Sequence, residues 1–95
     1  MVEELPFSES VISKGSIETV IRTFSSDTGL EDLKWHWDEE DRTIHPVGET
    51  DWMFQHDNQL PIQILSKIDI PKGAWHRLIK GTADLQLIVE KHRDI

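Results

Sequence analysis

The 95-residue sequence contains no cysteine, so disulfide bridges and thiolate metal ligands are excluded. This absence also fits a reducing compartment. No apolar run approaches the ~18 residues that mark a membrane-spanning helix. The acidic start, Met1-Val2-Glu3-Glu4, has neither the basic segment nor the apolar segment of a signal peptide. The sequence therefore predicts a soluble, cytoplasmic protein without a membrane partner.

Basic residues are also scarce, because ten Lys and Arg stand against 18 Asp and Glu and give a net charge of −8. A field of this sign repels a phosphate backbone. The basic residues are scattered and do not alternate with aromatic side chains, as they do in proteins that bind single strands. We therefore expect no nucleic-acid partner, whereas a small anionic ligand in a local pocket remains compatible with the composition.

The five glycines are isolated, so no glycine-rich phosphate loop is present, and no serine lies in a nucleophile-elbow context. Instead, turn residues separate short stretches rich in β-branched and aromatic side chains, a pattern typical of strands. We expect one all-β barrel or sandwich domain over residues 1–95, with its core over about 17–90. The expected strands are residues 17–24, 34–38, 42–46, 50–56, 60–64, 75–80 and 84–90.

Several turn residues predict how these strands connect. Gly48-Glu49 and Asp57-Asn58 are candidate hairpin turns, because these residue types tolerate left-handed backbone conformations. Pro61 favours an edge position for its strand, since proline donates no backbone hydrogen bond.

The two ends of the chain give weaker patterns. Ser8 could cap a short helix over residues 8–13, with Gly15 ending it. Residues 91–95 are expected to form a loose end.

A Trp-His step occurs twice, as Trp35-His36 and, after a turn, as Trp75-His76. Strand alternation places His36 on one face with Lys34 and Asp38, and the flanking tryptophans on the other face. If the two segments occupy neighbouring strands, their histidines come together. The two Trp-His segments therefore predict a pocket that contains both imidazoles.

Part of the second segment matches a known motif. Pro71, Gly73 and His76 stand at the three most telling positions of the second cupin motif, with Leu65 and Lys80 in place of its first glycine and its asparagine. The chain resembles small single-domain cupins of the RmlC-like superfamily, including short bacterial and phage proteins. The resemblance covers about residues 17–89 and implies a double-stranded β-helix, a jelly-roll-like barrel.

The first cupin motif, two histidines followed by a glutamate and a glycine, fits the sequence in two registers. In the first register, Lys34 and His36 take the histidine positions, Asp41 the glutamate position and Gly48 the glycine position. We prefer this register because it keeps a histidine, an acid and a glycine. It implies a ligand pocket of Lys34, His36, Asp41 and His76, with His36, Asp41 and His76 as metal ligands.

In the second register, His36 takes the first histidine position, and Asp38 and Arg42 replace the other two ligands. His45 shares a face with Asp41 in either register and is a reserve ligand. His56 and His92 are expected to be exposed to solvent.

The resemblance implies a divalent metal, and a set of imidazoles and a carboxylate suits Fe, Mn, Ni or Zn. If the protein is an enzyme, the resemblance implies an isomerase or a metal-dependent oxygenase acting on a small polar or anionic molecule. The alternative is a metal-free binding or structural module, since Lys34 would repel a cation.

Trp35 and Trp37 would form an exposed apolar patch on the outside of a barrel. We expect a homodimer that covers them, and a protein-interaction adaptor is the third interpretation.

Overall fold

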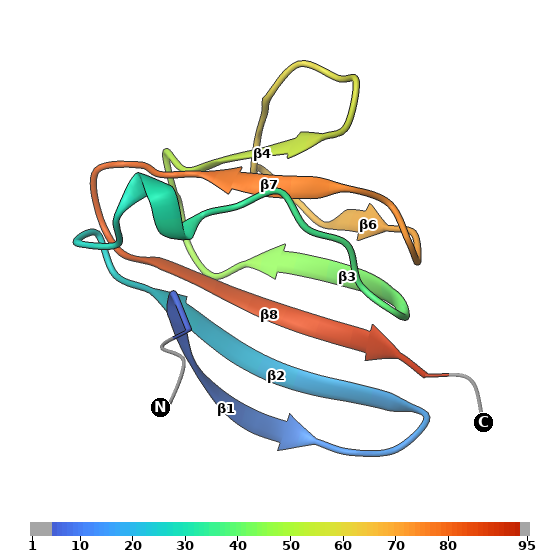
Figure 1. Cartoon of the computed structure of the whole chain (residues 1–95). Helices are drawn as coiled ribbons and strands as arrows, with labels where there is room; N and C mark the ends of the chain where they lie inside the picture. Colours follow the sequence, from blue (N-terminus) through green and yellow to red (C-terminus); the bar gives the residue numbers. More distant parts are fainter. Residues whose placement is uncertain (1–4, 94–95) are drawn as a thin grey trace, which may run out of the picture.

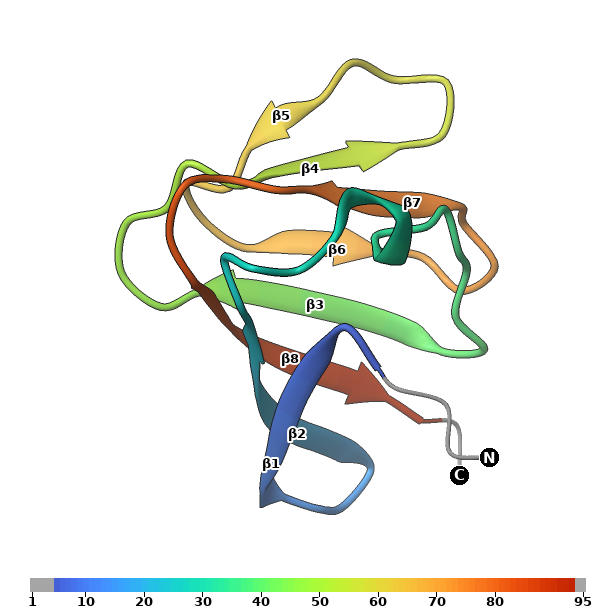
Figure 2. The same cartoon turned by 60° about the vertical axis from the view of Figure 1, so that its left-hand side comes forward.

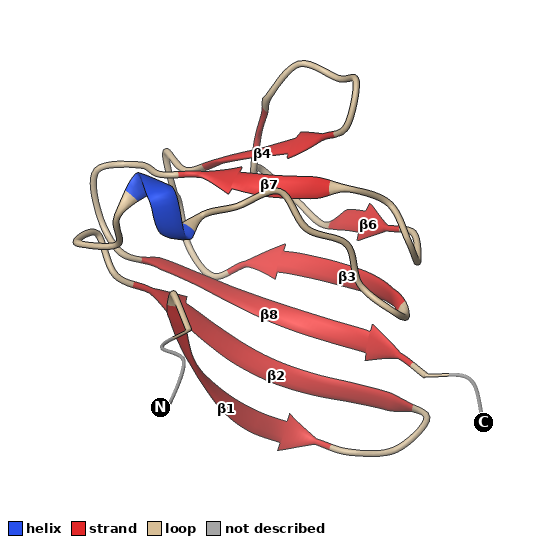
Figure 3. Cartoon of the chain, in the orientation of Figure 1, coloured by secondary structure: helices blue, strands red, loops and turns tan. Residues whose placement is uncertain are grey.

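The computed structural model describes residues 5–93, in which the regular secondary structure is almost entirely β-strand (Figure 1). The only helix in this part of the chain is one 3-10 turn, η1 (Leu30–Asp32), drawn in blue in Figure 3. The expected all-β fold is confirmed. The strands are β1 (Phe7–Ser13), β2 (Ile17–Phe24), β3 (Asp41–Pro46), β4 (Met53–His56), β5 (Ile62–Gln63), β6 (Ile68–Ile70), β7 (His76–Ile79) and β8 (Leu85–His92).

The strands form two antiparallel sheets. The larger has the order β1-β2-β8-β3-β6, and the smaller has the order β5-β4-β7. In Figure 2 the smaller sheet is at the top, near β6 and β3, and the β1–β2 hairpin is at the bottom, at the other end of the larger sheet. In the described residues, no helix is long and apolar enough to cross a membrane.

The core lies between the inner faces of the two sheets. Leu85, Leu87 and Val89 alternate along β8 and are all buried, as their spacing predicts. Phe54 reaches them from the smaller sheet. Trp52 is fully buried, and its indole N–H donates to the Ala83 carbonyl at 2.5 Å. The other buried apolar residues are Val20, Phe24, Ile44, Ile64, Ile68 and Ile70.

The turn between β4 and β5 agrees with the sequence pattern. Asn58 has a φ of 59°, and the two strands it connects are antiparallel neighbours. β5 is an edge strand, as Pro61 predicts. Gly48 has a φ of 77°, but the expected hairpin around it is wrong, because β3 and β4 lie in different sheets. The chain crosses from one sheet to the other at this point.

Three further expectations are corrected by the structure. The expected helix over residues 8–13 is wrong, because this segment is β1 and pairs with β2. Backbone groups of β2, and not a cap at Ser8, are the hydrogen-bond partners of this segment. β6 was not predicted, since its three residues are too few to give a pattern. β8 continues to His92, so the expected loose end over residues 91–95 is wrong for residues 91 and 92, and residues 94–95 lie outside the described residues.

The expected strand over residues 34–38 is reduced to one isolated bridge, between His36 and His76. The rest of this segment is irregular and runs beside β7, between η1 and β3. A second contact holds it in place, because the Gly73 N–H donates to the Asp38 carbonyl at 2.9 Å. Gly73 has a φ of 79°, which most other residue types adopt only with strain. These contacts position the candidate site.

Candidate metal centre

The two histidines of the Trp-His segments lie together, as the sequence predicts. The N–H of His36 donates to the His76 carbonyl at 3.0 Å, and the N–H of His76 donates back to the His36 carbonyl at 2.9 Å. Two residues that exchange both hydrogen bonds in an antiparallel pair project their side chains from the same face. The ring centroids are 4.3 Å apart.

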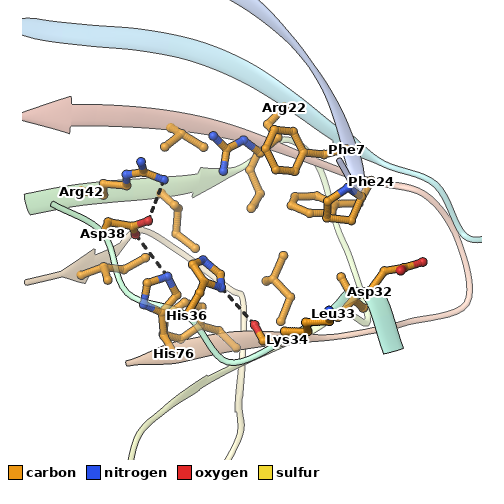
Figure 4. Close-up of a pocket in the computed structure, with 17 residues that line it drawn as sticks. Phe7, Arg22, Phe24, Asp32, Leu33, Lys34, His36, Asp38, Arg42 and His76 are labelled. Carbon is orange, nitrogen blue, oxygen red and sulfur yellow. Dashed lines mark hydrogen bonds and ion pairs between the residues drawn. The ribbon is translucent and has the colours of Figure 1, made fainter. Parts of the chain in front are cut away.

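Asp38 completes a cluster with these histidines (Figure 4). It lies two residues after His36, on the same face of an extended segment, and only 8% of it is exposed. Asp38 Oδ2 is 3.3 Å from Nε2 of His76, and Oδ1 is 3.2 Å from Nη1 of Arg42. One potential ligand atom from each of His36, Asp38 and His76 lies within 4.8 Å of the other two. No other such group of three occurs among residues 5–93.

Asp41 does not join this cluster, so the structure does not place it where the first motif register requires. Its side chain is exposed, and Oδ1 accepts a hydrogen bond from the Lys72 N–H at 2.7 Å. The reason is the alternation of β3. Ile44 is buried in the core, so Arg42 shares its inward face while Asp41 points outward. The fold therefore places His36, Asp38 and Arg42 as in the second register.

Lys34 contributes to the site mainly through its backbone. Lys34 lines the cavity, and its backbone carbonyl lies 3.0 Å from Nδ1 of His36. The Ala74 carbonyl stands in the same relation to His76, at 2.9 Å. A carbonyl oxygen only accepts hydrogen bonds, so Nδ1 of each ring carries a hydrogen. In the neutral rings, the lone pair therefore lies on Nε2, the atom free to bind a metal.

The other histidines lie outside the cluster. His45 shares a face of β3 with Asp41, as expected, but this face points outward, so His45 is not close enough to serve as a reserve ligand. Its Nε2 contacts Glu90 Oε1 at 2.5 Å. His92 contacts the Thr43 hydroxyl on the same outer face. His56 was expected to be exposed but is half-buried, because it pairs with His76 across β4 and β7 and its ring packs edge-on against Phe54.

The electrostatics favour a charged Asp38 beside a neutral His36. Burial alone would raise the pKa of the Asp38 carboxyl, but its contact with His76 and the positive charge of Arg42 outweigh burial and lower that pKa. Burial lowers the pKa of His36, and the neighbouring His76 lowers it further. Burial likewise lowers the pKa of His56.

The contact between Asp38 and His76 shows whether a metal fits this site. Asp38 Oδ2 has no hydrogen-bond partner among residues 5–93, although it is buried and lies 3.3 Å from Nε2 of His76. With neutral His76, two lone pairs face each other, which is unfavourable unless a cation or a proton lies between them. Two ligands of a tetrahedral zinc, each ~2.0–2.1 Å from the metal, are about 3.3–3.4 Å apart. The spacing of the Asp38 and His76 atoms therefore fits a divalent metal, and a donor atom of His36 lies within 4.8 Å of both.

A cavity of about 260 Å³ adjoins these three residues. Its polar end carries His36, Asp38, His76 and Arg42, whereas Figure 4 shows Phe7, Phe24 and Leu33 at the other end. The sequence reasoning missed Arg22 on this wall. Its position was predictable, because β2 alternates and Phe24 and Val20 on either side of Arg22 face the core.

Comparison of the sequence with models of known protein families and with curated proteins finds no match. Solved structures, in contrast, match over nearly the whole chain. The chain has the cupin fold, a double-stranded β-helix, as its sequence resemblance implies.

Three solved structures illustrate this likeness. A cupin domain from Bordetella pertussis Tohama I is 13% identical, with a TM-score of 0.69, and the match covers 99% of this chain and 100% of that one. An RmlC-like cupin family protein from Methanocaldococcus jannaschii is 8% identical, with a TM-score of 0.69, and the match covers 96% and 84%. Fe(II)-HppE, solved with an alternative substrate, is 11% identical with a TM-score of 0.70, and this chain spans 49% of its length. At these identities, the likeness shows the fold alone.

Proposed function

We propose that this protein binds one divalent transition metal through His36, Asp38 and His76, and a small molecule in the adjoining cavity. The observation that carries the proposal is the cluster itself, in which one potential ligand atom from each of His36, Asp38 and His76 lies within 4.8 Å of the other two. Asp38 Oδ2, which is buried 3.3 Å from His76 Nε2, has no hydrogen-bond partner among residues 5–93. The backbone carbonyls that fix both rings support it, because metal-binding histidines are usually oriented through their other nitrogen.

Two imidazoles and one carboxylate suit Fe, Mn, Ni or Zn and leave coordination positions open. A metal in such a site polarises an oxygen group bound at an open position. Structures of this fold with Fe(II) and with Co(II) in HppE support a metal of this class. The chain's own residues would hold His36 and His76 in one tautomer and keep Asp38 ionised.

One observation favours the metal-free alternative. Arg42 occupies the position at which cupins typically carry a glutamate ligand, and its guanidinium is 3.2 Å from the Asp38 carboxylate. A fixed cation this close opposes a second one. In that case, a proton on His76 would fill the gap to Asp38, and the cavity would bind its ligand without metal.

Metal analysis separates the two functions. Protein incubated with Zn²⁺, Mn²⁺, Ni²⁺ or, without oxygen, Fe²⁺ and then desalted should retain about one equivalent of one of them. His76→Ala should lose it, whereas His45→Ala, which removes an imidazole from the outer face of β3, should retain it. Less than about a tenth of an equivalent of every metal would reject the metal site and favour the metal-free alternative.

The expected homodimer also remains a proposal. Trp35, Trp37 and Trp75 are 38%, 49% and 47% exposed, on the side of their segments opposite the histidines. The bridge between His36 and His76 places Trp37 opposite Trp75, which supports one continuous apolar patch. Light scattering should give the mass of two chains, and Trp37→Ser should lower it. A one-chain mass for the unmodified protein at micromolar concentration would contradict the dimer.

A further inference from the structure

Two arginines lie on the wall of the cavity, although the whole chain has a net charge of −8. They are Arg22 on β2 and Arg42 on β3. Their carboxylate partners Glu9 and Glu40 are not among the lining residues. Two guanidinium groups on one wall favour an anion inside the cavity. The other charged lining residues are Asp38, which pairs with Arg42, and Lys34 and Asp32, which are exposed.

Arg22 is the less expected of the two arginines. Its side chain is only 12% exposed, and its guanidinium lies over the Phe7 ring, 3.8 Å from the centroid. Nε and Nη2 both donate to Glu9 Oε2, at 2.8 and 2.6 Å. Neither hydrogen of Nη1 has a partner among residues 5–93. Arg22 therefore keeps donors available for a ligand.

Arg42 offers the second guanidinium. Its Nε and Nη2 contact Glu40 at 3.1 and 2.9 Å, and Nη1 lies 3.2 Å from Asp38. With five N–H donors, a guanidinium engaged in this way still has hydrogens to give. Burial, and to a smaller extent the charge of Arg42, lowers the pKa of Arg22, so the two cations repel each other. An anion that binds both would relieve this repulsion.

The rest of the cavity is apolar. Phe7, Phe24, Leu33 and Leu78 line it away from the histidines. An enclosed space of ~150 Å³ holds a benzene molecule, so a cavity of about 260 Å³ has room for about ten non-hydrogen atoms. This space suits a ring or branched chain rather than a sugar or a nucleotide.

We propose that the ligand is an amphipathic carboxylate of about this size. Arg22 and Arg42 bind its carboxylate, and its apolar body lies against Phe24, Leu33 and Leu78. This inference rests on the proposed function only in placing the ligand in the same cavity, because the two arginines bind a carboxylate with or without a metal at His36 and His76. Arg is suited to this task, since its planar fork matches a carboxylate with two hydrogen bonds.

Calorimetric titration with three probes tests the ligand class in the unmodified protein. 3-Phenylpropanoate supplies both the anion and the body, its amide keeps the body without the charge, and propanoate keeps the charge without the ring. Hydrogen bonds to charged groups contribute about 1.5–3 kcal/mol, so the acid should bind about tenfold to a hundredfold more tightly than the amide. Propanoate should bind more weakly than 3-phenylpropanoate by at least about tenfold.

Variants assign the carboxylate to the two arginines. Arg42→Gln and Arg22→Gln should each weaken 3-phenylpropanoate about tenfold while leaving the amide within about twofold. Arg77→Gln is the matched control, because Arg77 contacts Gln55 and the Trp35 ring and does not line the cavity. If Arg22→Gln fails to fold, Arg42→Gln and the probe comparison still decide the question.

Each titration is run in chelator and again after loading with metal. Binding of the acid in both conditions, with the expected arginine dependence, supports the inference even if metal analysis rejects the metal site. Equal affinities for acid and amide, or no binding of the acid at millimolar concentration, would overturn the inference. Those results would leave the metal site intact if one equivalent of metal is still retained.

Discussion

Replacing Asp38 with asparagine separates the metal-bound from the metal-free interpretation of the site. The substitution keeps the shape of the side chain and removes its charge. Oδ1 of an asparagine could still accept from Arg42, which is 3.2 Å from Oδ1 of Asp38. The amide NH₂ in the place of Oδ2 could donate to Nε2 of neutral His76, which is now 3.3 Å from a carboxylate oxygen. The variant therefore gains a hydrogen bond to His76, and Arg42 loses the negative charge of its partner.

In chelator, these changes nearly cancel, because each hydrogen bond contributes about 0.5–1.5 kcal/mol. Asp38→Asn should therefore change the free energy of unfolding by less than about 1 kcal/mol. Metal at 100 times its Kd stabilises the unmodified protein by about 2.7 kcal/mol. If the lost ligand weakens binding about a hundredfold, only about 0.4 kcal/mol of this remains. The Tm difference between the two proteins in metal should be about 9–18 °C.

Urea unfolding in chelator measures the change in the free energy of unfolding, and thermal unfolding in excess metal measures the Tm difference. Asp41→Asn is the control, because it removes a surface carboxylate that accepts from the Lys72 N–H, and it should keep the full response to metal. A variant with Asp38→Asn that retains the metal response would refute Asp38 as a ligand. A loss above about 3 kcal/mol in chelator would instead indicate that Asp38 serves a buried ion pair with protonated His76 and Arg42.

Three further outcomes are expected. Because the pKa of Asp38 is lowered, its contribution to stability is present above the unfolded-state pKa and is lost as the pH falls through the folded-state pKa. The free energy of unfolding, measured in chelator, should therefore decrease from neutral pH to pH ~3. The decrease should be less steep in Asp38→Asn. The lowered pKa of His36 means that the unfolded state binds a proton more readily than the folded state, so stability should begin to fall as the pH drops through the ordinary histidine range. His36→Gln should remove this part of the pH profile, and an unchanged profile would contradict it. Gly73→Ala should lower the free energy of unfolding by about 1–2 kcal/mol and weaken metal binding, because Gly73 has a φ of 79° and its N–H donates to the Asp38 carbonyl. Gly15→Ala is the control, because Gly15 has no positive φ. Equal effects of the two substitutions would be evidence against this role of Gly73.

The sequence predicted the two histidines better than the acid between them. Pro71, Gly73 and His76 match the second cupin motif at its own spacing, so the resemblance indicated the turn at Gly73 and the position of His76. The choice between Asp38 and Asp41 depended on which face of β3 points inward. Ile44 settles this in the structure, and applying strand alternation backward from Ile44 would have placed Arg42 inward and Asp41 outward.

Strand alternation also decides which strands could be predicted from the sequence. β2 and β8 have the length and alternation that a pattern can show, and both were predicted. β1 was not, because six of its seven residues are exposed and no buried face marks it as a strand. It is a strand only because β2 offers backbone partners, and a sequence pattern does not display that pairing.

The central position of β8 has a consequence for how the chain folds during synthesis. β8 lies between β2 and β3, and Ile17 at the start of β2 pairs with His92 at the end of β8. β2 and β3 therefore have no common neighbour until the last of the eight strands has left the ribosome. Until then, the apolar faces of β2 and β3 remain open to chaperones or to other chains. Completion of the larger sheet is therefore a late step.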